Sequence, residues 1–201
     1  MQINYYTFLL LFLCNSLFAN SVSEDSLGLI QLEKLFAESN KIWNPEGPFD
    51  RNIELLKQAK ILSEQIKAPE KTVESLIKIA VTYSYKFDEV NFMAYIDSSH
   101  YVAEKHLDKK HNYFLFIFSN YADIYRKKRQ YYKAIDFCEK GLSNSTKATP
   151  VSTGSLYNKI AKNYISLGDY YKALKYLDIA YNLSLKSKAN FAWYDTHNMF
   201  A

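Results

Sequence analysis

The chain has 201 residues, enough for one ordinary domain or a short array of repeats. Glycine (5) and proline (4) are scarce, which disfavours an all-β fold with many tight turns. The formal net charge of +4 is modest for a nucleic-acid-binding protein, and the two cysteines cannot support a disulfide framework.

The first 19 residues contain no charged side chain and are interpreted as a signal peptide. The stretch 5–12 is apolar, and the small residue Ala19 precedes a polar stretch that starts at Asn20. This apolar run is too short for a membrane span, which needs about 20 apolar residues. No lysine or arginine precedes it, which departs from the usual signal pattern, and a buried N-terminal helix is the alternative. We expect an exported, periplasmic protein that begins near Asn20.

Cys14 raises the question of a lipid anchor. Leu11 and Cys14 have the spacing of a lipoprotein signal, but Leu13 stands where a small residue is normal. Lipidation at Cys14, and membrane attachment through it, is therefore disfavoured.

The segment 20–70 is predicted to form an atypical first helical unit. A helix is expected over 27–42, a loop over 43–48 and a partner helix over 53–66, with Pro69 separating this unit from the next. End units of a solenoid pack on one side only, so a weaker pattern is expected there.

The clearest pattern in the chain is an internal repeat. The residues YYKAI at 131–135 recur as YYKAL at 170–174, thirty-nine positions later, and a fixed period of this size indicates stacked copies of one unit. In the last copy, apolar residues over 156–165 follow one face of a helix, Gly168 can end it, and a second apolar face runs over 170–181. Each copy is predicted to be a helix, a tight turn and a second helix.

Three such units are predicted over 71–110, 111–150 and 151–187. Ala134 and Ala173 hold the same position in two second helices, and Ala94 is predicted to hold it in the earlier unit. The step from Ala80 to Ala94 is two residues longer than the matching steps, which predicts an insertion in the turn near 87–89.

Tyr157, Ile160-Ala161, Tyr164 and Ala173 resemble the pattern of the tetratricopeptide repeat (TPR) family. The spacing between copies is longer than that family's usual 34 residues. The resemblance implies an all-α, right-handed solenoid of about four helix-turn-helix units plus a terminal helix. It also implies binding of a peptide or partner protein on a concave face lined by the first helices.

The stretch 188–201 has aromatic residues spread around a helix instead of along one stripe. It is predicted to be either an apolar cap or, the favoured interpretation, the first helix of a further repeat. An exposed apolar segment of this kind predicts self-association through 188–201.

No constellation points to catalysis, a cofactor or a metal. The four histidines include no pair on one helical face, and Cys138 replaces an apolar second-helix residue. The densest charge run, 126–129, is expected to be a solvated loop or an electrostatic rim for an acidic peptide. We predict a protein that is not an enzyme and does not bind nucleic acid.

The resemblance places outward first-helix residues on the binding face. A carboxylate clamp of the kind used by chaperone-tail binders is incomplete here. The predicted partner-binding residues are Tyr85, Ser119, Asp123, Arg126, Asn158 and Lys162, and Ile77, Val81 and Ser84 are expected on the same face.

The predicted function is an exported interaction module or scaffold. The composition, rich in lysine, asparagine, tyrosine and isoleucine, resembles exported proteins of Bacteroidota. The alternative is the N-terminal sensor portion, or a truncated relative, of a membrane signalling protein such as a TPR-containing histidine kinase or helix-turn-helix regulator.

Overall fold

The computed structural model describes residues 26–144 and 149–187, and all regular structure within them is helical. The predicted all-α class is confirmed for these residues, whereas the predicted signal peptide and terminal helix lie outside them. A helix at 26–42 is followed by α2 (Asp50–Gln65), α3 (Pro69–Tyr85), α4 (Glu89–His106), α5 (Asn112–Lys127), α6 (Tyr131–Asn144), α7 (Pro150–Ser166) and α8 (Tyr170–Ser187).

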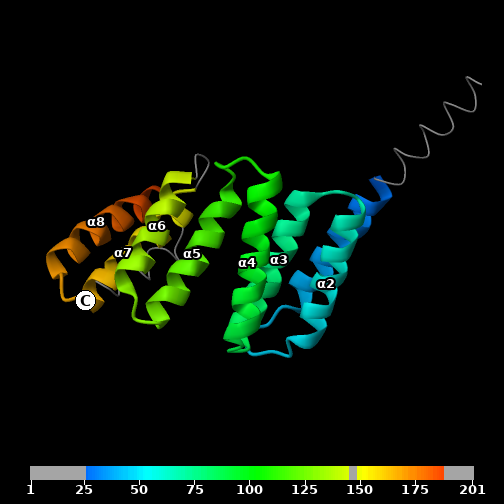
Figure 1. The fold of residues 1–201 in the computed structure, drawn as a ribbon, viewed down its shortest axis with the longest axis horizontal. Helices are drawn as coiled ribbons and strands as arrows, with labels where there is room; N and C mark the ends of the chain where they lie inside the picture. The colour runs from blue at the N-terminus through cyan, green and yellow to red at the C-terminus, as the bar shows by residue number, and fades with distance from the viewer. Residues whose placement is uncertain (1–25, 145–148, 188–201) are drawn as a thin grey trace, which may run out of the picture.

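The helices lie side by side in chain order along the long axis of the molecule (Figure 1). The most extensive packing is within the pairs α3–α4, α5–α6 and α7–α8. The first helices of these pairs also contact one another, α3 with α5 and α5 with α7. This arrangement confirms the predicted α-solenoid of helix-turn-helix units.

The same three-residue turn joins α2 to α3, α3 to α4, α5 to α6 and α7 to α8. The middle residue of its three connecting residues has a positive φ: 52° at Lys67, 57° at Phe87, 59° at Arg129 and 78° at Gly168. The next amide then donates to the carbonyl five residues back, as Asp169 does to Tyr164. This is the hydrogen bond of a Schellman helix end, which requires the left-handed conformation.

The common turn shows that the predicted insertion near 87–89 is wrong. Phe92, 4% exposed, lies at the position in α4 that Ala134 and Ala173 hold in α6 and α8, whereas Ala94 is exposed. The step from Ala80 to Phe92 is 12 residues, the same as the matching steps in the two later units. The alanine pattern misled because a buried phenylalanine takes the alanine position.

Aromatic rings fill the middle of the solenoid. Phe137 of α6 stacks on Tyr125 of α5 at 5.2 Å between ring centroids, and Phe118 lies 6.0 Å from Phe114. His100 of α4 meets the Phe118 ring edge-on at 5.4 Å. Tyrosine and phenylalanine, 18 and 13 in the chain, therefore form much of the interior of the middle units.

The N-terminal units have a largely aliphatic core, and buried hydrogen-bonded polar groups lie beside it. The Asn52 side chain in α2 donates to the Ser39 carbonyl at 2.8 Å, and its oxygen accepts from the Thr82 hydroxyl in α3 at 3.1 Å. The Ser63 and Thr72 hydroxyls are 2.9 Å apart between α2 and α3. Because each group is paired, burying it is tolerated.

Across residues 26–144 and 149–187, none of the helices combines the length and the apolar character that a membrane crossing requires.

Candidate partner-binding face

The first helices form one continuous side of the solenoid, linked by polar contacts that recur one repeat apart. Lys71 of α3 pairs with Glu33 at 2.6 Å, and the Tyr113 hydroxyl of α5 lies 3.3 Å from a Glu74 carboxylate oxygen. Lys159 of α7 forms an ion pair with Asp123 of α5. These contacts fix the spacing of the helices along this side, which we call the first-helix face.

Several predicted binding residues lie on the surface of this face. Tyr85 is 45% exposed at the end of α3, and Arg126 is exposed near the end of α5. Ser119 and Lys162 are half-buried on α5 and α7. These four side chains can meet a partner.

Asp123 and Asn158 are placed differently from the prediction. The Asp123 carboxylate pairs with Lys159, so it connects two units instead of standing ready for a partner. Asn158 is only 3% exposed, so its prediction as an outward residue is wrong. The helical period identified its face of α7 but could not show that neighbouring helices cover that position.

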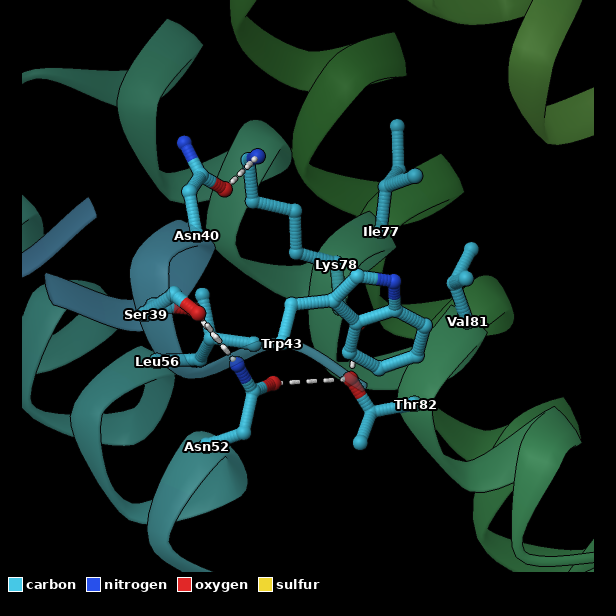
Figure 2. A pocket seen from close by; sticks show the side chains of 9 residues that line it. All are labelled: Ser39, Asn40, Trp43, Asn52, Leu56, Ile77, Lys78, Val81 and Thr82. Atoms are coloured by element: carbon cyan, nitrogen blue, oxygen red, sulfur yellow. Dashed lines mark hydrogen bonds between the residues drawn. The ribbon is translucent and has the colours of Figure 1, made fainter. Parts of the chain in front are cut away.

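A cavity on this face lies between the helix at 26–42, α2 and α3 (Figure 2). Its volume is about 190 Å³. Ile77 and Val81 of α3 form an apolar wall on one side, and Leu56 lies on the α2 side. A cavity of this size admits a side chain of a partner, not a whole cofactor.

Trp43 lies across the middle of this cavity (Figure 2). Its ring meets Tyr85 edge-on at 5.1 Å and Phe49 at 6.2 Å, which holds the indole in place. The indole nitrogen is turned to the side where Ile77 and Val81 lie (Figure 2). A tryptophan held in this way offers both a flat apolar surface and a hydrogen-bond donor.

The polar groups of the cavity are arranged in two sets. Below the indole in Figure 2, the Ser39–Asn52–Thr82 chain is fully occupied with internal hydrogen bonds. At the opposite rim, the Lys78 ammonium donates to the Asn40 side-chain oxygen at 3.2 Å. Lys78 is the one charged residue among those that line the cavity in the described structure, so this rim favours acceptor groups of negative charge.

Most residues of this cavity were not predicted from the sequence. Ser39, Asn40 and Trp43 belong to the atypical first unit, where no repeat pattern assigned a face. Lys78 could have been found, because it matches Lys159 in the repeat alignment and both donate to the preceding first helix. Ile77 and Val81 were expected on this face and line the cavity.

No family model matches the chain, and no curated protein matches it. Several solved structures match it. A putative kinesin light chain from Podosopora anserina with nearly identical TPR-like repeats matches with a TM-score of 0.58 and 17% identity, over 81% of this chain and 77% of that one. A variant of that protein with one substitution matches with a TM-score of 0.60 and 16% identity, over 86% and 82%.

BtubC (BKLC) from P. vanneervenii matches with a TM-score of 0.59 and 14% identity, over 70% of this chain. The chain spans 58% of that structure's length. At these identities the likeness shows the fold alone: the described part of the chain is folded as an α-solenoid of TPR-like repeats.

The part of the chain that the structure describes contains no cluster of three or more histidine, cysteine, aspartate or glutamate side chains that could hold a metal ion. Cys138 is fully buried, and burial raises the pKa of its thiol to about 12. It is a core residue and not a nucleophile.

Proposed function

We propose that the protein is an interaction module whose first-helix face binds an extended segment of a partner protein. The cavity around Trp43 takes an apolar side chain of that segment, and Lys78 at its rim meets an acidic group. Farther along the face, Ser119, Arg126 and Lys162 contact the rest of the segment.

The observation that supports this proposal is the half-buried Trp43 in a cavity on the first-helix face. Its ring lines the cavity together with Leu56 and Thr82 and stays partly open to solvent. Aromatic side chains in partly open cavities are the usual anchors of protein-protein contacts.

The test is selection of 12-residue peptides from a random displayed library on the immobilised protein. Affinity is then read from the fluorescence of Trp43, with Trp193, the second tryptophan of the chain, changed to phenylalanine. Lys78→Met and Val81→Ser should each weaken the selected peptides by roughly 10-fold, about 1.4 kcal/mol.

Lys105→Met is the matched control, because Lys105 is exposed on a second helix and lines no part of the cavity. Arg126→Ala should weaken longer peptides only. Asp123 is left unchanged, since its loss would break the ion pair with Lys159. Selected peptides that bind all variants equally would show that the first-helix face is not the binding site.

We further propose that the protein is exported and acts in the periplasm of a Bacteroidota-type cell. The apolar, uncharged stretch over residues 1–19 supports this proposal. N-terminal sequencing of the protein from cell fractions tests it: a mature start near Asn20 is expected, and an intact Met1 in the cytosol would contradict it.

Self-association through 188–201 remains a proposal of the same kind. Light scattering on the chain with and without these residues should show a dimer that becomes a monomer. A monomer in both samples would exclude it.

A further inference from the structure

The turns that join α3 to α4 and α5 to α6 lie along the lower edge of the solenoid in Figure 1, and the α7–α8 turn continues this edge at the left end. On its α5–α8 part, the segments 126–136 and 165–175 contain the turns and the start of each second helix. They carry seven basic and two acidic side chains, an excess of five positive charges. The whole chain has a net charge of +4, so its positive charge is concentrated here.

Large aromatic side chains are interleaved with these charges. Tyr132 and Tyr171, 72% and 70% exposed, hold the same position, the second residue of α6 and of α8, and Tyr170 is 65% exposed beside them. Rings of this size are normally buried in a solenoid core. Here they project from the turns together with lysines, and we call the two segments the basic–aromatic edge.

Two of the seven basic side chains on this edge are in ion pairs, Lys127 with Glu89 at 3.3 Å and Lys172 with Asp169. The two acids are paired locally, Asp136 with Lys140 at 2.8 Å and Asp169 with Lys172 at 2.9 Å. Within the described residues, Lys128, Arg129 and Lys133 have no carboxylate partner. Lys128 and Lys133 lie over the ring of Tyr125, at 6.0 and 4.1 Å from its centroid, which holds both cations on the edge.

The matching part of the edge on α3–α4 has a different character. Its segment 84–94 contains Lys86 against Asp88 and Glu89, although Phe87 and Val90 are 88% and 80% exposed. The apolar row therefore continues along the edge, whereas the positive charge is confined to α5–α8. On this edge, exposed large side chains and an excess of positive charge therefore occur together in the α5–α8 part.

We propose that the basic–aromatic edge docks the protein on an anionic lipid bilayer. Tyrosine rings favour the headgroup level of a bilayer, and lysine and arginine beside them are attracted to anionic headgroups. This docking leaves the cavity around Trp43 open for a partner, and it does not depend on the peptide-binding proposal.

The test is sedimentation of the full chain with vesicles of phosphatidylcholine alone or with roughly 30% phosphatidylglycerol, a content that gives the bilayer a negative surface potential. The triple variant Lys128→Gln, Arg129→Gln, Lys133→Gln should lose affinity for the anionic vesicles by roughly 100-fold. The matched control is Lys105→Gln, Lys109→Gln, Lys110→Gln, which removes the same charge from exposed residues at the opposite edge. It should bind as the unchanged protein does.

Two further arms identify what is recognised. Tyr132→Ser with Tyr171→Ser should weaken vesicle binding while the charge is unchanged, and about 0.5 M salt should release the protein. Binding through the apolar residues 1–19 would be equal for both triple variants and for neutral vesicles, and would overturn the proposal. Binding to a DNA duplex or to polyglutamate as tight as to anionic vesicles, unaffected by the tyrosine changes, would overturn it as well.

Discussion

The N-terminal and middle units of the solenoid have the same backbone plan and apolar cores, but the N-terminal units also bury hydrogen-bonded polar pairs, whereas the middle units bury stacked aromatic rings. Between α2 and α3 the contact contains the Asn52–Thr82 hydrogen bond at 3.1 Å. Between α5 and α6 it contains aromatic rings such as Tyr125 and Phe137, whose planes are 4° from parallel, packed on aliphatic residues. The backbone therefore does not decide which chemistry fills an interface.

One matching position in the first helices shows that different kinds of side chain can be buried at the same place in the repeat. It is Thr82 in α3, Ile124 in α5 and Asn163 in α7, each directly before a tyrosine and each buried. Thr82 is hydrogen-bonded and Ile124 packs among apolar residues. The Asn163 side-chain oxygen has no hydrogen-bond partner in the described structure. The same site thus accepts a paired polar group, an apolar group and an unpaired polar group, at different free-energy costs.

The largest expected effect is in the aromatic units. Phe118→Ala should lower the free energy of unfolding by about 3–5 kcal/mol, because Phe118 is 7% exposed and packs against Phe114 and Phe137. Urea denaturation followed by circular dichroism measures it. Phe116→Ala, at a 46% exposed position of the same helix, should change stability by less than about 1 kcal/mol. Equal losses would show that the aromatic contacts are not the main support of these units.

The polar interface should behave as a coupled pair. Thr82→Val leaves the Asn52 oxygen buried without a donor and should cost about 1–3 kcal/mol. The double variant Asn52→Leu, Thr82→Val should be more stable than the sum of the two single losses, because both polar partners are then removed. Additive losses in this double-mutant cycle would mean that the hydrogen bond contributes nothing specific.

Asn163→Ile should raise the free energy of unfolding by about 1 kcal/mol. It removes a buried oxygen that has no partner and places in α7 the residue that α5 already holds at Ile124. The reciprocal change Ile124→Asn should destabilise and serves as the control. A loss of stability in Asn163→Ile would indicate that the asparagine makes a contact that outweighs the unpaired oxygen.

The smallest effect is a pH dependence from Cys138. Burial raises the pKa of its thiol to about 12 in the folded state, against about 8.5 in an unfolded chain. The unfolded state therefore loses this proton first, and stability falls as pH rises from about 8.5 towards 12. Between about pH 8 and 9.5 the loss is about 1 kcal/mol, and it should be absent in Cys138→Ala. Parallel pH profiles for the two proteins would contradict the assignment.

The sequence was sufficient for the helix-turn-helix plan, because apolar periodicity and the repeated YYKA segment depend on local spacing alone. The prediction from sequence was wrong where another residue type takes a repeat position. Phe92 holds the second-helix position of Ala134 and Ala173, whereas Ala94 had been predicted there. A single chain cannot reveal such replacements, since a helical face tolerates different side-chain volumes when its neighbours adjust.

The candidate site was predictable only in part, because its residues come from different units. Ile77 and Val81 follow from the helical period, but Trp43 lies after the first helix, where no period applies. The pairing of Asp123 with Lys159 depends on how α5 and α7 lie side by side. Tertiary contacts of this kind are not encoded in local spacing.

The common left-handed turn has a consequence for protein engineering. Its three residues carry a fixed pattern of hydrogen bonds and a positive φ, so a longer peptide spliced after Arg129 would separate two helices that must cross closely. The connection from α4 to α5 differs from this turn. It covers residues 107–111 and begins with the extended backbone of Leu107, at the end of the 18-residue helix α4. A fluorescent reporter inserted between Asp108 and Lys109 would therefore leave the register of the array intact, with the cargo carried at the edge opposite the α5–α6 turn.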